Sequence, residues 1–457
     1  MKRIAMLAIS IIFSWSAYSQ TVKSSFFHLN DLGTSRSVVR TYKPNEIIAS
    51  TFSITEQLEM FVFIKDSNIH TYMTVPYGYS INDFVIFNNS IYFCGRNVSL
   101  NCGYIGIFDI PATNQSVGAY KLFHVDSVKN LTDIVAYQGP ATDAIGIVAI
   151  GTPKNTSYKS SVVDLNNYSL SYYPSWNIFI GSTNEEIITD VAMIDPYQVV
   201  TVGKSKASSS SSGLVAYNSK LYLRRYKGSC VIGSGLEDIL YEYQNVREPI
   251  LDGSFLVKSI DDDNFAVASV TTKPRIGHFM PIAYVVNVMN INMFALQINK
   301  SQYIPSPKGT LKDLEYFPNR TTIAAVMQDT LNLGHVFFAD MTKTANYSTN
   351  KISRSNTVFN SITRYSGNSF LISSYVTNLI NRSLSFLHED LNYFKESNCS
   401  VDEVVETTAS VTAITPQTKT SEMDHIEYPI NFMSAYPSVY ETNLTIDCAS
   451  YYKSNNQ

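Results

Sequence analysis

Short β-strand patterns recur along this chain at a nearly regular interval. Each copy opens with an apolar-x-Asp or similar triplet and a short apolar strand. A turn follows, then a second strand that often ends in Gly, and a third that tends to end in Asp or Asn. The clearest copy begins at Ile81-Asn82-Asp83, with its second strand over 91–95 and its third over 104–109. We count seven copies between about residues 35 and 395, about 47 to 70 residues apart.

A repeat of this kind predicts stacked sheets. One small sheet cannot bury both of its faces, so each unit must pack on its neighbours, and at a period near fifty residues the β-propeller does this. We therefore predict an all-β fold: a seven-bladed β-propeller over residues 20–395, with a small C-terminal extension, 396–457, packed on it. In blade pattern the sequence resembles the secreted seven-bladed propellers of bacteria, but it lacks the combination of Gly-His and Trp-Asp dipeptides that, as a set, marks WD40 repeats. Two stacked β-sandwich domains are the alternative.

The first and last blades of a propeller must be joined, because an open ring would leave free strand edges. Two segments compete for the closing strand: residues 21–34 and the C-terminal extension. Within the extension, residues 426–452 predict two strands. Residues 402–424, rich in Thr, Ser, Glu and Val, show no clear strand alternation.

The first 19 residues have the organisation of a secretory signal peptide. Lys2 and Arg3 precede a short apolar core over 4–13, and small residues stand at the cleavage positions before Gln20. We expect cleavage near Ser19 and a secreted or periplasmic protein. No later segment is predicted to cross a membrane. The net charge of −4 gives no electrostatic reason to bind nucleic acid.

Export permits disulfide bonds. Cys94 and Cys102 lie on consecutive predicted strands, and Cys399 and Cys448 flank the C-terminal region, so the sequence predicts a bridge within each pair. Cys230 is then left as a buried thiol. No pair has the C-x-x-C spacing of a redox or zinc site, and we predict no metal.

The recurring aspartates invite a catalytic interpretation because they occupy equivalent positions in the repeat. We favour a structural one, in which each carboxylate accepts backbone N–H bonds at a turn. These residues are Asp83, Asp133, Asp190 and Asp313.

Other acidic residues are weak candidates for a binding or catalytic site. They are Asp252, Asp261, Asp262 and Glu315, and no spacing rule singles any of them out. The run 261–263 lies at a predicted hairpin turn without the spacing of a calcium loop. The chain has no Gly-x-Ser-x-Gly elbow, phosphate-binding loop or dinucleotide fingerprint, and we predict no cofactor.

Three functions are compatible with these features. The favoured prediction is an exported, non-catalytic propeller that binds a protein or glycan through loops on one face. The alternative is a secreted glycosidase or lyase with carboxylates from different blades at the central channel. The third is a structural component of an envelope complex, with the C-terminal extension as its contact.

Overall fold

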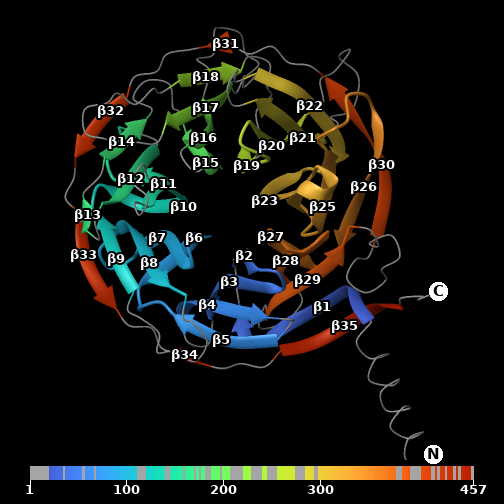
Figure 1. Cartoon of the computed structure of the whole chain (residues 1–457), viewed down its shortest axis with the longest axis horizontal. Coiled ribbons are helices and arrows are strands. Elements are labelled where there is room, and N and C mark those ends of the chain that lie inside the picture. The colour runs from blue at the N-terminus through green and yellow to red at the C-terminus, as the bar shows by residue number, and fades with distance from the viewer. Residues whose placement is uncertain are drawn as a thin grey trace, which may run out of the picture.

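The computed structural model is built of antiparallel β-sheets set radially around a central axis (Figure 1). The structure describes residues 20–33, 37–53, 57–65, 68–110, 120–138, 145–157, 160–168, 171–173, 176–180, 187–195, 198–205, 220–227, 239–243, 255–272, 284–292, 297–376, 383–391, 403–412, 417–418, 423–427, 430–435, 439–440 and 444–453. The all-β prediction is confirmed, and the radial arrangement is that of a β-propeller rather than of two sandwiches.

Four sheets each consist of a meander, a run of consecutive antiparallel strands, to which one strand from the C-terminal region is added at the outer edge. The first meander is β2 (Ser37–Lys43), β3 (Glu46–Ser53), β4 (Leu58–Lys65) and β5 (Asn68–Thr74). The second is β6 (Tyr79–Phe87), β7 (Ser90–Asn97), β8 (Cys102–Asp109) and β9 (Tyr120–Val125). The third is β10 (Val128–Gln138), β11 (Ile145–Pro153), β12 (Ser160–Tyr168) and β14 (Trp176–Ile180), with β13 (Ser171–Tyr173) also on β12. The fourth is β15 (Ile187–Asp195), β16 (Gln198–Ser205), β17 (Lys220–Lys227) and β18 (Ile239–Tyr243).

A nine-stranded sheet joins two further meanders through one shared strand, β30 (Glu403–Thr412). One of them is β19 (Leu256–Ser259), β20 (Asn264–Thr272), β21 (Tyr284–Asn292) and β22 (Gln297–Ser306). The other is β23 (Gly309–Phe317), β24 (Thr322–Asp329), β25 (Gly334–Asp340) and β26 (Tyr347–Arg354), with the short helix η1 (Pro318–Arg320) after β23.

The remaining sheet closes the ring with the N-terminal strand. Its order is β27 (Thr357–Ser366), β28 (Ser369–Val376), β29 (Ser383–Asp390), β1 (Gln20–Gly33) and β35 (Leu444–Lys453). Strand β1 pairs with β29 from Ser24 opposite Glu389 to His28 opposite Ser385. Of the two candidates for the closing strand, the N-terminal segment therefore has this role, and the C-terminal strand β35 lies outside it.

The C-terminal segment runs around the outside of the ring. After β30 come β31 (Gln417–Thr418), β32 (Met423–Glu427), β33 (Ile430–Ala435), β34 (Val439–Tyr440) and β35. They pair in turn with β18, β14, β9, β5 and β1, so the segment passes the sheets in the reverse of chain order (Figure 1). We call β30 to β35 the belt. The sequence did not predict β30, because this polar strand is held by backbone pairing with β26 and β22 and needs little apolar alternation.

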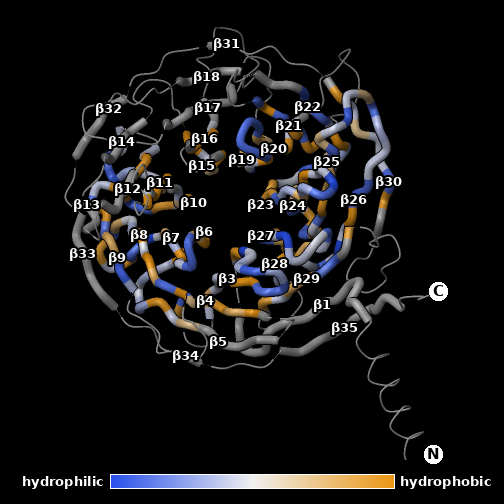
Figure 2. The backbone as a smooth tube through the Cα atoms, viewed as in Figure 1, coloured by the Kyte–Doolittle hydropathy of each residue, from blue (hydrophilic) through white to orange (hydrophobic). Residues whose placement is uncertain are grey.

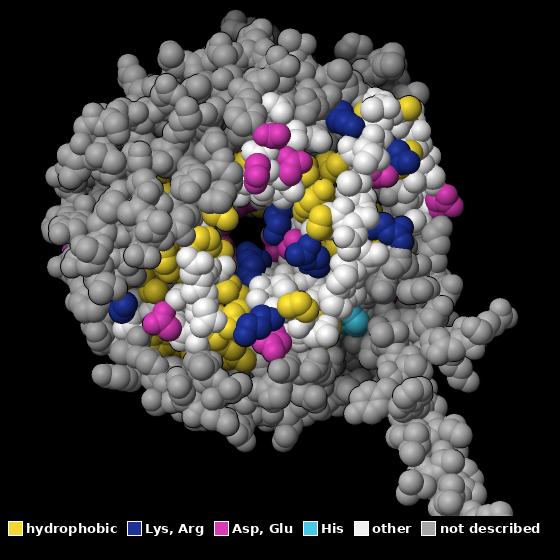
Figure 3. Space-filling model, viewed as in Figure 1, with side chains coloured by type: hydrophobic (Ala, Val, Ile, Leu, Met, Phe, Trp, Pro, Cys, Tyr) yellow, Lys and Arg dark blue, Asp and Glu magenta, His cyan; other side chains and the backbone are white. Residues whose placement is uncertain are grey.

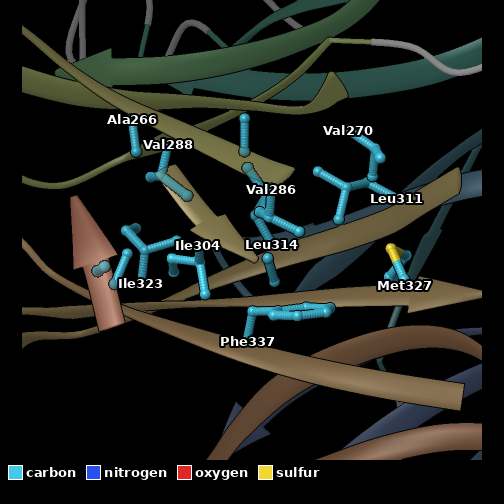
Figure 4. Close-up of a cluster of buried hydrophobic side chains, with 14 of the residues drawn as sticks. Ala266, Val270, Val286, Val288, Ile304, Leu311, Leu314, Ile323, Met327 and Phe337 are labelled. Carbon is cyan, nitrogen blue, oxygen red and sulfur yellow. The ribbon is translucent and has the colours of Figure 1, made fainter. Parts of the chain in front are cut away.

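The core consists of aliphatic and aromatic layers between neighbouring sheets, and Figure 2 shows apolar residues along the strands with hydrophilic residues at many turns. In one layer, Val286 and Val288 of β21 face Leu314 of β23 and Phe337 of β25, and all four are buried (Figure 4). Burying each such side chain contributes about 1.5 to 3 kcal/mol. Sheet-on-sheet packing is thus the main force that holds the ring together.

The apolar-x-Asp triplet marks a β-bulge in the innermost strand of a meander. The pairing register slips by one residue just before Asp83, Asp133, Asp190, Asp313 and Ser361. The Gly that ends the second strand lies opposite the start of the bulge, as Gly95 lies opposite Ile81. A Cβ at Gly95 would lie 1.7 Å from the Ser80 carbonyl oxygen. The Asp triplet of the first strand and the Gly of the second strand therefore both belong to the β-bulge.

The predicted bridge between Cys94 and Cys102 is wrong. On strands β7 and β8, Cys94 lies opposite Ile105 while Cys102 lies opposite Asn97, three residue pairs away. An offset of three places two side chains on opposite faces of a sheet, beyond the reach of a disulfide. Both cysteines are buried. Cys399 and the side chain of Cys448 lie outside the described residues, so their bridge stays a prediction.

Candidate functional site

Polar side chains from the innermost strands gather at the axis. These strands are β2, β6, β10, β15, β19, β23 and β27, the first strand of each meander. Figure 3 shows a central opening bordered by basic and acidic side chains. We call this group the axial network. Its members are Arg40, Asp83, Asp133, Asp190, Lys258, Asp313, Glu315 and Ser361.

Arg40 of β2 lies at the centre of the axial network. Its Nη2 donates to Asp83 Oδ1 at 2.8 Å, and its Nη1 donates to Asp313 Oδ2 at 3.2 Å and to Ser361 Oγ at 3.1 Å. Sequence reasoning missed this residue. The signal that could have identified Arg40 is its charge. It is a basic residue in the first strand of the earliest repeat copy, which has no Asp in its opening triplet.

The recurring aspartates join neighbouring sheets. Asp133, Asp190 and Asp313 each accept the N–H of the following residue, as Asp133 does from Ile134. The second oxygen accepts an N–H from the next innermost strand. Three such bonds are Val191 to Asp133 at 3.0 Å, Val257 to Asp190 at 2.6 Å and Ile362 to Asp313 at 3.1 Å. The structural interpretation holds, but the bond crosses to the neighbouring sheet instead of capping the residue's own turn.

The remaining junctions between innermost strands are bridged as well. Lys258 of β19 forms a 3.0 Å ion pair with Glu315 of β23. The N–H of Val39 donates to Ser361 Oγ at 3.3 Å, which joins β2 to β27. Asn82 Nδ2 donates to Asn130 Oδ1 at 2.7 Å, which joins β6 to β10. Together with the Arg40–Asp83 pair, these contacts link every neighbouring pair of innermost strands in a closed circuit.

The electrostatics of the axial network are dominated by burial. Burial raises the pKa of Asp83 and of Asp133 well above the ordinary value; Arg40 opposes the rise at Asp83, and the neighbouring Asp190 adds to it at Asp133. Burial also raises the pKa of Asp190, to about 6. Ionising three neighbouring buried carboxyls together is costly, so these carboxyls bind protons more tightly than isolated carboxyls in water. Burial opposes the charge of Arg40, but Asp83 and Asp313 raise its pKa overall.

A pH dependence of stability follows from Asp190. Its pKa in the folded chain, about 6, lies above its ordinary 3.8, so protons bind the folded state more tightly. The stabilisation is complete below pH about 4 and is lost as pH rises through 6. Between pH 7.5 and pH 5 we expect this group to add about 1 kcal/mol to the free energy of unfolding.

The measurement is the melting temperature against pH for the parent and for Asp190→Asn. We expect the melting temperature of the parent to rise on acidification, and the slope near pH 6 to be smaller in the variant. An equal slope in both proteins would exclude Asp190 as the titrating group, whatever the absolute stability of the variant.

The acidic candidates that the structure describes lie in two different surroundings. Asp261 and Asp262 are exposed in the turn between β19 and β20, where Asp261 Oδ1 accepts bonds of 2.9 Å from the Asp263 N–H and from Asn264 Nδ2. Glu315 belongs to the axial network through Lys258. Asp252 lies outside the described residues. Among the described residues, no hydrogen bond joins Asp261 or Asp262 to Glu315.

The described residues contain neither a candidate metal site nor a candidate membrane-spanning helix. No group of three His, Cys, Asp or Glu side chains in this part of the chain could hold a metal ion. None of the helices in the same residues has the length and apolarity needed to cross a membrane.

A second surface carries exposed apolar side chains. Among the described residues, the large hydrophobic residues that are exposed are Tyr77, Val98, Leu100, Ile187 and Leu331. Each lies where a meander begins or between its second and third strands. In an antiparallel meander these positions share one end, and the axial bonds join equivalent positions of successive sheets. These side chains therefore lie on the same face of the ring.

Three of these side chains come from two adjoining turns. Tyr77, 79% exposed, precedes β6, and Val98 and Leu100, 59% and 55% exposed, connect β7 to β8. The N–H of Val98 donates to the Gly78 carbonyl at 2.8 Å, so the turns are joined directly. We call Tyr77, Val98 and Leu100 the loop patch. Sequence reasoning expected functional loops on one face but could not identify them.

Polar contacts fix the loop patch to the strands that carry it. The N–H of Leu100 donates to Asn97 Oδ1 at 2.9 Å, and Tyr79 Oη lies 2.6 Å from His124 Nε2. At the base of the second turn, Arg96 Nη2 donates to Asn101 Oδ1 at 2.7 Å, while the buried Nε of Arg96 has no hydrogen-bond partner. The loop patch is thus a fixed surface with a cation at its edge.

The sequence matches no known family model and no curated protein. Solved structures of similar fold include the following three. The β-propeller domain of the Trilobed protease from Pyrococcus furiosus is 8% identical with a TM-score of 0.42, over 78% of this chain and 96% of that one. The α-L-arabinofuranosidase Arb93A from Fusarium graminearum is 9% identical with a TM-score of 0.40, over 82% and 98%. The endosialidase of phage phi92 is 9% identical with a TM-score of 0.43, over 81% and 69%. Likeness at this level carries no argument about function.

Proposed function

We propose that this chain is an exported, non-catalytic seven-bladed β-propeller that binds a protein partner through the loop patch. The count of seven is supported by the innermost strands, when the two meanders that share β30 are taken as separate blades. Export is supported by the signal-like pattern of residues 1–19 alone, because those residues lie outside the described part of the chain.

The observation that carries the proposal is a contrast between the two surfaces. At the axis, the carboxylate oxygens of the aspartates accept hydrogen bonds from backbone N–H groups and from Arg40. Carboxylates bound in this way are poorly suited to attack or protonate a substrate. At the loop patch, three apolar side chains remain in solvent although the turns that carry them are held rigidly. Contiguous exposed apolar surface of this kind is typical of binding sites.

The chemistry of the loop patch favours a protein over a glycan. Val98 and Leu100 offer aliphatic surface, which sugar hydroxyls do not match, while Tyr77 is a residue type enriched at protein interfaces. The described part of the structure places no carboxylate against Arg96, whose Nη2 bonds the Asn101 amide. We therefore expect a partner segment with an apolar side chain close to an Asp or Glu.

The double variant Tyr77→Ser, Leu100→Ser tests this proposal. The probe is a displayed library of random twelve-residue peptides selected on the full chain, followed by affinity measurements on the enriched peptides. We expect enrichment of an apolar residue next to Asp or Glu, and at least about tenfold weaker binding to the double variant. Its melting temperature should match that of the parent because both side chains are exposed.

Leu331→Ser is the matched control, since Leu331 is 77% exposed on the same face but belongs to the turn between β24 and β25. Peptides that bind the double variant and the control equally well would refute the loop patch as the site. Arg96→Gln should reduce the preference for acidic peptides without abolishing binding.

A glycan-acting enzyme is the second candidate. The observation in its favour is the pKa of Asp190 near 6 beside Asp83 and Asp133, whose pKa values are also raised, since a carboxyl with a raised pKa can act as a general acid. Sugar released from a panel of plant, host and microbial glycans by the parent, and not by Asp190→Asn, would favour this candidate over the binding function.

A further inference from the structure

The belt makes contacts of steadily increasing separation along the sequence. Its first residues pair with a nearby strand, as Glu403 lies opposite Ser353 of β26. Its last residues pair with the beginning of the described chain, as Lys453 lies opposite Gln20 of β1. Between these ends, β31, β32, β33 and β34 pair with strands of successively earlier meanders.

Strand β30 joins two meanders at once. Residues 403–409 pair with β26, and residues 410–412 pair with β22. Two hydrogen bonds to side chains also stabilise this junction. The Val411 N–H donates to Asn346 Oδ1 at 3.2 Å, and Tyr347 Oη of β26 donates to Gln302 Oε1 of β22. Ala409 is fully buried in the layer between these meanders. Neither β22 nor β26 alone can provide this site.

Strand β35 covers the closing strand. β1 lies between β29 and β35 and is paired with both, from Gln20 opposite Lys453 to Leu29 opposite Leu444 on the belt side. A strand held on both edges is harder to detach than one at an open edge. Strand β35 therefore occupies the second edge of the strand whose pairing with β29 closes the ring.

We propose that the belt is a latch that assembles on an already closed ring and slows its opening. Contacts of great sequence separation form late because their loop-closure entropy must be offset by structure already in place. Interactions that are absent from the folding transition state slow unfolding and leave the folding rate unchanged. The belt also covers the outer edges of β5, β9, β14 and β18, which would otherwise be open to pairing with another molecule.

The test uses the full chain with a specific protease site inserted in the connection between β29 and β30, cut after folding. The control carries the same site between Thr344 and Ala345, an exposed turn before β26, where cutting leaves the belt covalently attached. Size-exclusion chromatography in rising denaturant follows belt release. Stopped-flow denaturant jumps give the folding and unfolding rates. This experiment is independent of binding at the loop patch.

We expect the cut belt to remain bound in native buffer and to leave at a denaturant concentration at which the ring is still folded. The beltless ring should then unfold at least about tenfold faster than the cut control, refold at the parent rate and self-associate on removal of denaturant. Loss of belt and ring in one transition would overturn the proposal, because the ring would then not exist without the belt. An unfolding rate equal to that of the cut control would overturn it too.

Discussion

Replacing Arg40 by Gln lowers the free energy of unfolding by about 3 kcal/mol, the expected result when one member of a buried ion pair is removed. The guanidinium contacts Asp83 at 2.8 Å and Asp313 at 3.2 Å, and only 26% of the arginine side chain is exposed. Without it, Asp313 loses its cation and the link between β2 and β6 is broken. Equilibrium unfolding in denaturant, monitored by tyrosine fluorescence or circular dichroism, measures the loss.

The matched control is Lys258→Gln, which removes the other cation of the axial network. Lys258 is 33% exposed and pairs with a single carboxylate, Glu315, so its loss should cost less than about 1 kcal/mol. Adding Asp83→Asn to Arg40→Gln should recover part of the loss, because the uncompensated carboxyl is then neutral. If Arg40→Gln costs no more than Lys258→Gln, the closed circuit at the axis does not stabilise the ring.

The local part of the axial network could be predicted from the sequence, and its connections could not. The recurrence of Asp133, Asp190 and Asp313 at one place in the repeat indicated a shared backbone-bonding role, which the structure confirms. The N–H groups that bind their second carboxylate oxygens lie in the next sheet, dozens of residues away, and no local pattern marks them. Arg40 was harder still, since it contacts Asp313 on a strand at the other end of the repeat series.

For the fold as well, local features could be predicted from the sequence and long-range connections could not. Stacking of repeats follows from the need of each small sheet to bury two faces, so the sequence supported a propeller. Pairing between distant strands decides which segment closes the ring. The sequence therefore left two candidates for the closing strand, β1 and the C-terminal extension. The Cys94–Cys102 error came from assuming that cysteines on consecutive strands face each other, whereas the β7–β8 register sets them three pairs apart.

Gly95→Ala is expected to lower the free energy of unfolding by about 3 kcal/mol, at the upper end of the usual cost of overpacking. The added methyl would lie 1.7 Å from the Ser80 carbonyl oxygen and 2.8 Å from its carbon, and both are backbone atoms. A side chain could rotate away, but this backbone cannot. This backbone belongs to the bulged stretch of β6. It is held in place by the hydrogen bond from Asn82 Nδ2 to the Leu131 carbonyl and by the Asp83–Arg40 ion pair.

Gly367→Ala separates this steric cost from the general cost of replacing a glycine. Gly367 lies in the turn between β27 and β28 with φ of +53°, and an added methyl group would have no neighbouring atom within 4 Å. Only left-handed backbone strain of about 1 kcal/mol is therefore expected. Both variants are compared with the parent by denaturant unfolding. Equal losses at the two sites would mean that the bulge yields to the methyl group, and the pairing of the Asp triplet with the strand-ending Gly would then need another physical cause.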